Sequence, residues 1–381
     1  MSAHSASAPR ALDAGSVSQG LHAATAPQQQ PVVSPRSARP APGFTEPGRR
    51  RRALRYAGVT VALALAAVAL WWAMVLVGST WYSPAEVVAV IAGRDVPGAS
   101  FAVGQLRLPR ALLGVLAGLA FGIAGRTSQT MLRNQLASPD VIGITSGAST
   151  AAVFAILVLG WSGMRVNLLA LGCGLGTALI IYLLSGSGST QGGRLILIGI
   201  GISAMFSSVI SYLQLRASIY SVADAMRWLS GSLADAGWDQ VPLLGGAVVV
   251  LGGTLLALSR ELTALSLGEE TATGLGVAVA RTRLLLLLST VALAAFATAA
   301  TGPIAFVAFL AGPVTARLVG RTDRSLLLPS ALMGAVIVLA ADLAGQHLFP
   351  TNLPVGVVTG IVGAPYLLVQ LIRLNREGAS A

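Results

Sequence analysis

The sequence has no lysine: all 25 of its basic residues are arginine, against 14 acidic residues. The phosphate-binding loop of P-loop ATPases needs a lysine to reach the phosphates, so an ATPase site of this type is excluded within the chain. Charged residues form only 10% of the 381 residues, where about a quarter is usual in a soluble domain. The hydrophobic share of 54% also excludes a chain that is disordered throughout.

Metal-binding and catalytic motifs are also missing. Cys173 is the only cysteine, so it cannot form an internal disulfide, and no metal ligand stands beside it. The sequence contains neither H-E-x-x-H nor G-x-S-x-G, and no cluster of histidine, cysteine and carboxylate could hold a catalytic metal. We therefore expect no cofactor and no enzyme activity, and a membrane enzyme is the least favoured class of function.

The first 48 residues differ from the rest of the chain. They are rich in Ala, Ser, Pro and Gln and have no apolar periodicity, which predicts a disordered tail. Arg49, Arg50, Arg51, Arg52 and Arg55 follow, directly before the uncharged run 57–78. We expect residues 1–48 to form a cytoplasmic N-terminal tail and residues 49–381 to form one membrane domain.

Long uncharged runs recur along the remaining sequence and predict an all-α membrane protein. A run of about 20 apolar residues crosses the hydrocarbon core as a helix, and continuous rather than alternating runs disfavour a closed β-barrel. The run 284–316 is too long for one span, and it breaks at Gly302-Pro303 because proline cannot donate to the preceding turn. The breaks give about ten transmembrane helices, near 55–78, 110–131, 140–160, 166–185, 194–215, 240–259, 281–300, 303–320, 327–347 and 355–373.

The distribution of arginine predicts the orientation of these spans. With the N-terminus inside, the inner loops hold 16 arginines and the outer loops hold 6. An excess of basic residues marks the cytoplasmic side of a membrane protein. An even number of spans then places both termini in the cytoplasm, and the basic balance reports topology rather than nucleic-acid binding.

Four charged or titratable residues stand out near the predicted span ends. Arg107 and Arg110, three residues apart at the outer start of the second span, share one side of a helical turn. They could pair with carboxylates of a soluble partner, although interfacial anchoring by snorkelling is the commoner role. Arg126 in the second span and Asp342 in the ninth are functional candidates because charge is rare in membranes, and structural pairing explains them equally well.

A short amphipathic stretch, 265–276, interrupts the spans between the sixth and the seventh. Ser266 stands three residues before Glu269, which is the spacing of a capping box that starts a helix, and Gly274 and Gly276 would end that helix. A short cytoplasmic helix of this kind is either a contact for a cytoplasmic partner or a solvated loop helix, and the spacing favours neither.

Three serines in the fifth span form a stripe. Ser203, Ser207 and Ser211 recur every four residues and so share one helix face. They could line a polar passage, but hydrogen bonding between helices is the commoner reason for such a stripe.

Five segments carry a family resemblance: Arg107-Leu-Pro-Arg110, Arg133-Asn-Gln-Leu-Ala-Ser-Pro139, Leu265-Ser-Leu-Gly-Glu-Glu270, Thr301-Gly-Pro-Ile-Ala-Phe-Val307 and Leu353-Pro-Val-Gly-Val-Val-Thr-Gly-Ile-Val-Gly-Ala-Pro365. In this order and at this spacing they resemble the FecCD-type permeases, the membrane subunits of ABC importers for iron–siderophores, haem and vitamin B12. The resemblance covers about residues 55–376, nearly the whole membrane part.

This resemblance implies a ten-helix protomer in the cell (inner) membrane, paired with a second permease protomer as a homodimer or a paralogous heterodimer. It also implies two cytoplasmic ATP-binding subunits and an extracellular or periplasmic siderophore-binding protein. Arg107 and Arg110 then match the pair that docks the binding protein. Ser266, Leu267, Gly268, Glu269, Glu270 and Gly274 match the coupling helices that sit in a groove of the ATPase. Ser203, Ser207 and Ser211 match a helix that lines the translocation path, to which we add Gly302 and Pro303.

The sequence departs from the family pattern at a few positions. Gln135 stands where the family usually has proline, Asn352 where it often has an acidic residue, and Arg126 where it is usually apolar or small. The segment Gly312-Pro-Val-Thr-Ala-Arg317 replaces a Pro-His-Ile-Ala-Arg pattern and resembles siderophore permeases, including the ferric-enterobactin type, more than the B12 type.

The sequence therefore predicts the permease subunit of an ABC importer for a ferric siderophore. Such a permease works by alternating access and leaves ATP hydrolysis to a partner subunit. Haem and vitamin B12 remain alternative cargoes within the same family. A secondary transporter driven by an ion gradient is the second hypothesis; it needs an ion site within the membrane, for which Asp342 is the only acidic candidate.

Overall fold

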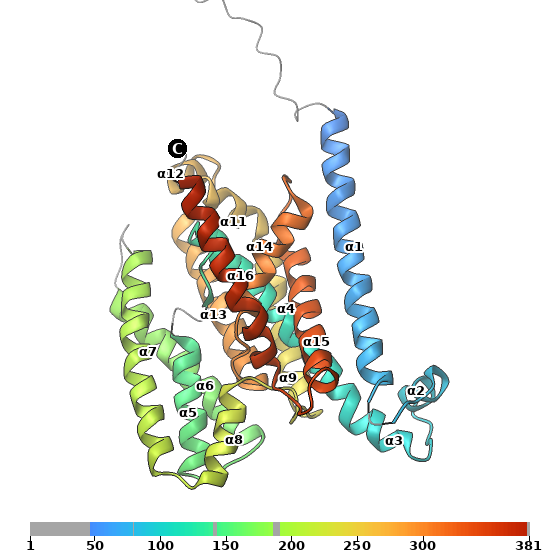
Figure 1. Cartoon of the computed structure of the whole chain (residues 1–381). Coiled ribbons are helices and arrows are strands. Elements are labelled where there is room, and N and C mark those ends of the chain that lie inside the picture. Colours follow the sequence, from blue (N-terminus) through green and yellow to red (C-terminus); the bar gives the residue numbers. More distant parts are fainter. Residues whose placement is uncertain (1–45, 79, 140–142, 186–190, 379–381) are drawn as a thin grey trace, which may run out of the picture. The chain divides into compact units, whose positions relative to one another are not determined.

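The computed structural model describes residues 46–78, 80–139, 143–185 and 191–378, and none of these residues lies in a strand. The chain divides into two units, residues 1–48 and residues 49–381. The first unit lies outside the described residues except for 46–48, so its disorder stays a prediction. The second unit holds the membrane helices (Figure 1).

The helices of the described ranges follow one another through short connections. In chain order they are α1 (Glu46–Leu76), α2 (Pro84–Ile91), α3 (Ala99–Phe101), the π-helix η1 (Ala102–Arg107), α4 (Leu108–Met131), α5 (Ile144–Leu157), α6 (Met164–Ser185), α7 (Gln191–Arg216), α8 (Ile219–Leu229), α9 (Gln240–Ala247), the π-helix η3 (Val248–Gly252), α10 (Gly253–Ala257), α11 (Ser259–Ser266), α12 (Glu269–Gly274), α13 (Val279–Thr301), α14 (Val307–Val319), α15 (Leu327–His347) and α16 (Val355–Gly378).

Ten apolar helical segments correspond to the ten predicted spans, which confirms the all-α class. In the described ranges, eight are long and apolar enough to cross a membrane by length and composition, counting 99–131 and 240–257 as one segment each. The other two, α5 with 14 residues and α14 with 13, are shorter. At 1.5 Å per residue they extend about 20 Å, less than the roughly 30 Å of a hydrocarbon core.

The residues before α14 explain why the helical part of the eighth predicted span is short. The predicted span began at residue 303, but the chain stays non-helical through 302–306 and the helix begins at Val307. Gly302 and Phe306 both have positive φ, 71° and 64°. Ile304 between them is 2% exposed. Irregular backbone at membrane depth is tolerated where it is buried in protein, and this segment meets that condition.

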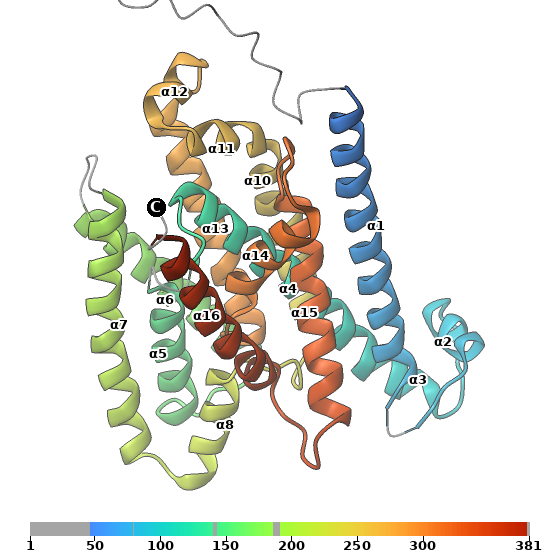
Figure 2. The ribbon, with the colours of Figure 1, turned by 45° about the horizontal axis from the view of Figure 1, so that its top comes forward.

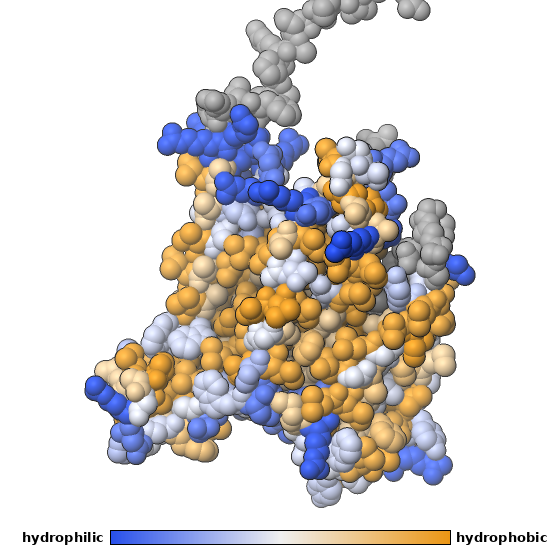
Figure 3. All heavy atoms as spheres, turned by 180° about the vertical axis from the view of Figure 1, so that it is seen from behind, coloured by the Kyte–Doolittle hydropathy of each residue, from blue (hydrophilic) through white to orange (hydrophobic). Residues whose placement is uncertain are grey.

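The surface of the second unit suits a lipid environment. Seen from behind, a broad apolar band occupies the middle of the surface, and hydrophilic residues gather at both of its ends (Figure 3). Large apolar side chains on α1, α6, α7 and α16 are exposed, among them Leu65, Leu183, Leu197 and Val362. A soluble protein rarely exposes so large an apolar surface.

Helix α4 is the centre of the packing. Gly118 and Gly122 lie against the backbone of α15, at Ala335 and Ser330, and Gly125 lies against the backbone of α14 at Ala308. A Cβ at any of the three would collide with that backbone. Small residues that let helix backbones approach closely are the main packing device inside membranes.

The two ends of the second unit differ in what they carry. In both ribbon views α11 and α12 lie at the same end as the first residues of α1, while α2 and α8 lie at the opposite end (Figures 1 and 2). The connection between α14 and α15 also reaches the first end, where Asp323 pairs with Arg52 at 3.4 Å. We name the first the basic end, because the arginines that begin α1 lie there, and the second the α8 end.

The predicted capping box at Ser266 and Glu269 is wrong. Ser266 is the last residue of α11, and its hydroxyl donates to the backbone oxygen of Thr263 at 2.6 Å. Helix α12 begins after Gly268, whose φ of 128° suits glycine alone. The short helix predicted in this stretch is α12, which ends at Gly274 as expected but begins after Gly268, while the hydroxyl of Ser266 bonds within the preceding helix α11.

A capping box does exist elsewhere, at the start of α2. The Ser83 hydroxyl accepts from the Glu86 backbone amide, and the Glu86 carboxylate accepts from the Ser83 amide at 2.7 Å and from its hydroxyl at 2.8 Å. These donors lower the pKa of Glu86, since they favour its charged form.

Candidate functional site

The predicted coupling residues lie together at the basic end of the molecule. Leu267 and Gly268 join α11 to α12, and Glu270 lies in the first turn of α12. The side chains of Leu267 and Leu275, before and after α12, are each 64% exposed, whereas Ala272 between them is buried. This α11–α12 segment, residues 259–276, therefore exposes two apolar side chains and the carboxylate of Glu270.

Two contacts fasten the α11–α12 segment to the helices below it. The guanidinium of Arg133, in the connection after α4, donates to the backbone oxygen of Leu265 at 3.1 Å. Arg283 near the start of α13 pairs with Glu269 at 2.7 Å. The segment is therefore bonded to the connection that follows α4 and to the first turns of α13.

At the α8 end, Arg107 is engaged with the end of α1. Its guanidinium donates to the backbone oxygens of Val75 and Leu76 at 3.1 Å each and to that of Thr80 at 2.8 Å, and it lies 5.0 Å from the centre of the Tyr82 ring. The last carbonyls of a helix have no partner within the helix, so Arg107 supplies the donors that α1 lacks.

Arg110 is engaged with a different helix. Its Nε and Nη2 donate to the two carboxylate oxygens of Asp342 on α15, at 2.9 and 2.8 Å. Gln346 donates to the same carboxylate at 2.7 Å. The Asp342 side chain is 1% exposed and that of Arg110 is 24% exposed. The two predicted docking arginines thus point to different helices, and a docking role for either stays a prediction.

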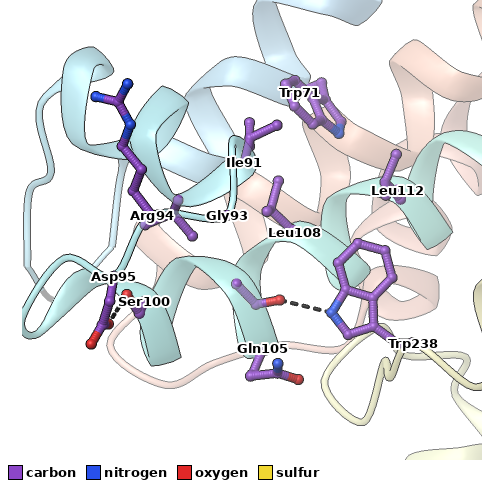
Figure 4. A pocket seen from close by; sticks show the side chains of 12 residues that line it. Trp71, Ile91, Gly93, Arg94, Asp95, Ser100, Gln105, Leu108, Leu112 and Trp238 are labelled. Carbon is purple, nitrogen blue, oxygen red and sulfur yellow. Dashed lines mark hydrogen bonds between the residues drawn. The ribbon is translucent and has the colours of Figure 1, made fainter.

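A cavity of about 560 Å³ lies beside this motif, between α2, η1, α4 and the connection before α9 (Figure 4). The indole of Trp238 reaches across from that connection and donates to the backbone oxygen of Gly104 at 2.8 Å. Trp71, Leu108 and Leu112 form an apolar side of the cavity. The contact ties the connection 230–239 to the π-helical turn η1 that ends at Arg107.

The serine stripe lies on a helix that few other elements cover. The Ser203 hydroxyl is 2.7 Å from that of Ser146 on α5. Ser207 and Ser211 are exposed, and each donates to the backbone oxygen four residues earlier, at 2.9 Å. One serine therefore bonds between helices, and the other two face the surface of the chain. Their place in a translocation path stays a prediction.

Gly302 and Pro303 lie at a crossing of three backbone segments. Gly302 packs against the backbone oxygen of Trp228 at the end of α8, and Pro303 against Gly231. The Gly356 amide donates to the Gly231 oxygen at 3.1 Å, which brings the start of α16 to the same point. The structure gives this pair no contact with the serine stripe among the described residues, and their role in translocation stays a prediction.

A polar cluster between α14, α16 and the connection after α4 escaped the sequence reasoning. Arg317 donates to the side-chain oxygen of Gln370 and lies 5.3 Å from the centre of the Tyr366 ring. Gln370, 4% exposed, donates in turn to the side-chain oxygen of Gln135 at 3.2 Å. The one available signal was that Gln135 stands where the family usually has proline.

Arg126 and His347, the remaining titratable residues that the sequence singled out, do not form a binding site with other described residues. The Arg126 guanidinium makes no hydrogen bond or ion pair with any residue that the structure describes, and the side chain is partly exposed. His347 bonds its own helix at the Leu343 oxygen, 3.0 Å away. Over the same ranges no group of three or more His, Cys, Asp or Glu side chains could hold a metal ion.

The described residues form ten apolar helical segments, one of which is the glycine-lined central helix α4, and a two-helix segment is exposed at one end; this is the architecture of a multi-pass membrane protein. Residues 64–373 match the model of the FecCD transport family. The chain belongs to the FecCD transport family.

Known proteins with similar sequences are iron–siderophore permeases. The ferric enterobactin transport system permease protein FepG of Escherichia coli is 38% identical over 301 residues, which cover 79% of this chain and 91% of that protein. The achromobactin transport system permease protein CbrC of Dickeya dadantii is 38% identical over 317 residues, 82% of this chain and 91% of its own length. A metal-chelate type ABC transporter solved in an inward-facing conformation matches with a TM-score of 0.74 and 28% identity, covering 83% of this chain and 99% of that one.

Proposed function

We propose that this chain is the membrane-spanning permease subunit of an ABC importer that carries a ferric siderophore across the cytoplasmic membrane. The observation that carries the proposal is the similarity along most of the chain to permeases for ferric enterobactin and achromobactin. ATP hydrolysis belongs to a separate cytoplasmic subunit, and a substrate-binding protein delivers the cargo from outside. A second permease protomer, identical or paralogous, completes the path.

The α11–α12 segment is the contact for the ATPase in this proposal. Its exposed Leu267 and Leu275 would enter an apolar groove, and Glu270 would meet a basic group at the rim. Its ties to α4 through Arg133 and to α13 through Glu269 would carry the motion of the ATPase into the helix bundle. The side that faces the cytoplasm is then the basic end, in keeping with the arginine excess.

The contacts along the path are weak by necessity. A cargo bound tightly within the membrane could not leave, so the permease has no need of a strong chelate site. The exposed hydroxyls of Ser207 and Ser211 on α7 are polar groups of this weakly binding kind.

The test is uptake of radiolabelled iron in cells that lack the chromosomal copy of this gene. Cells that regain it should take up iron delivered as a ferric siderophore, and neither excess haem nor excess vitamin B12 should compete. Replacement of the phosphate-binding lysine in the partner ATPase should abolish uptake. Uptake that survives this replacement would refute an ABC importer, and competition by haem or vitamin B12 would refute the siderophore as cargo.

A further inference from the structure

Arginines from two distant parts of the chain meet at the basic end. The first turns of α1 lie against the end of α14 and the connection between α14 and α15, residues 320–326. The Nε of Arg55 donates to the backbone oxygen of Leu318 at 3.0 Å, and the Tyr56 hydroxyl donates to that of Ser325 at 3.1 Å. We name the arginines of these two segments the basic patch: Arg51, Arg52, Arg55, Arg321 and Arg324.

The basic patch carries more positive charge than the neighbouring side chains compensate. Asp323 lies 3.4 Å from Arg52, and its side chain is 74% exposed. An ion pair that is exposed to this degree contributes little. The other four arginines of the patch form no ion pair with any residue that the structure describes. Five positive charges therefore face one negative charge, and a bound anion would relieve their repulsion.

The guanidinium groups of the patch still have hydrogen-bond donors to offer. Arg55 uses its Nε on Leu318, and its two terminal nitrogens donate to no described residue. The side chains of Arg321 and Arg324 are exposed and make no hydrogen bond within the described ranges. The Arg324 guanidinium lies 5.5 Å from the centre of the Tyr56 ring, and a contact with a ring face leaves the N–H groups free. A phosphate matches these donors, because its oxygens can accept from several arginines at once.

Exposed apolar side chains beside the patch distinguish a lipid from a soluble phosphate. Arg51 heads a stripe on α1 whose members stand three, four or seven positions apart and so share one helix face. The apolar members of this stripe are each more than half exposed: Leu54, Val61, Leu65 and Val68. The apolar band of the surface begins directly beside the hydrophilic residues of the basic end (Figure 3). A soluble phosphate would leave the stripe uncovered, whereas a phospholipid would cover it with acyl chains while its phosphate reached the arginines.

We propose that the basic patch binds the phosphate of an anionic phospholipid in the cytoplasmic leaflet. The acyl chains of this lipid lie along the apolar stripe of α1. Its phosphate accepts from arginines on α1 and on the connection between α14 and α15, so the lipid fastens these two elements together. The inference goes beyond the proposed function, and it needs only that the chain spans the membrane with the basic end on the cytoplasmic side.

The experiment titrates the complete, detergent-solubilised transporter with phosphatidylglycerol or phosphatidylcholine and counts the bound lipids by native mass spectrometry. The wild-type transporter should bind phosphatidylglycerol more tightly. Arg321→Gln/Arg324→Gln should weaken the binding of phosphatidylglycerol about tenfold, and Arg324→Gln alone about threefold, because each arginine contributes to attraction of the head group. Neither side chain bonds another described residue, so the fold should be kept.

The matched control is Arg194→Gln/Arg281→Gln, which removes two exposed arginines from the first turns of α7 and α13. It should change the affinity for phosphatidylglycerol by less than about twofold, since both positions lie outside the patch. An equal loss in the control and in Arg321→Gln/Arg324→Gln would show attraction to the whole basic end and would overturn the site.

Three further results would also count against the proposal. Wild-type affinity of Arg321→Gln/Arg324→Gln for phosphatidylglycerol would remove the patch as the binding site. Equal binding of the two lipids by the wild-type transporter would show that the anionic head group is not recognised. Displacement of phosphatidylglycerol by inorganic phosphate would show that the acyl chains do not hold the ligand. Iron uptake is measured separately, so each of these results leaves the proposed function standing.

Discussion

Asp342 is a buried charge whose partners come from two elements. Arg110 approaches it from α4, and Gln346 approaches from the next turn of its own helix. A buried ion pair adds little net stability, because the desolvation of both charges offsets their attraction, but the loss of one partner leaves a charge uncompensated. The pair therefore fixes how α4 meets α15 at the α8 end.

We predict that Arg110→Gln destabilises the protein more than Asp342→Asn does. The carboxylate is 1% exposed and would be left buried and unpaired, at a cost on the order of 3 kcal/mol, whereas the guanidinium is 24% exposed and can still reach water. The double variant Arg110→Met/Asp342→Leu should be more stable than Arg110→Gln. Thermal unfolding in detergent measures all three. A double variant that is less stable than Arg110→Gln would contradict the prediction.

The glycines of α4 are an element-scale feature, since they set the distance between three helices. Gly122→Ala should unfold the protein or lower its melting temperature steeply, because the new Cβ meets the Ser330 oxygen and the Ala331 Cα. Overpacking of this kind typically costs about 1–3 kcal/mol or more. Gly172→Ala on α6 is the control: its Cβ meets nothing within 4 Å, and alanine favours the helix. Equal melting temperatures for the two variants would show that α4 does not pack as described.

The α11–α12 segment gives the second element-scale prediction. Glu270→Arg should reduce ATPase activity of the assembled transporter about tenfold, because a repulsive charge would face the rim of the partner groove. Asp323→Arg is its control at the same end, since the Asp323 side chain is 74% exposed and only loosely paired with Arg52. The ATPase rate of the purified complex in nanodiscs reports both. A normal rate with Glu270→Arg would remove the segment from the coupling surface.

At the scale of the whole molecule, the orientation of the ends can be measured with single cysteines. Cys173→Ser gives a cysteine-free background, because the chain has one cysteine. In intact cells a membrane-impermeant maleimide should label Asp235→Cys at the α8 end and should leave Glu270→Cys at the basic end unlabelled until the cells are opened. Labelling in the reverse order would invert the orientation drawn from the arginine excess.

The sequence by itself determined where the spans lie and to which family the chain belongs. Length of an apolar run, proline breaks and arginine between runs are local properties, so most of the ten segments could be placed to within about four residues, although α1 begins at Glu46, nine residues before the predicted start. The errors are also local: the helix after Gly302-Pro303 begins four residues late, and the hydroxyl of Ser266 caps the helix that it ends rather than the next one. Which neighbouring backbone group a side chain bonds depends on the local backbone geometry, and the spacing of residues in the sequence does not determine that geometry.

Only the tertiary structure decided what the predicted site residues touch. Arg107 and Arg110 stand three residues apart, yet one binds α1 and the other binds Asp342, 232 positions away. The cavity of about 560 Å³ beside η1 likewise draws residues from several parts of the chain, and no single segment predicts it. A local sequence pattern shows which face of a helix is apolar and is stabilised by burial. The partner of a polar side chain depends instead on which helices pack together, and that depends on the packing of the whole bundle.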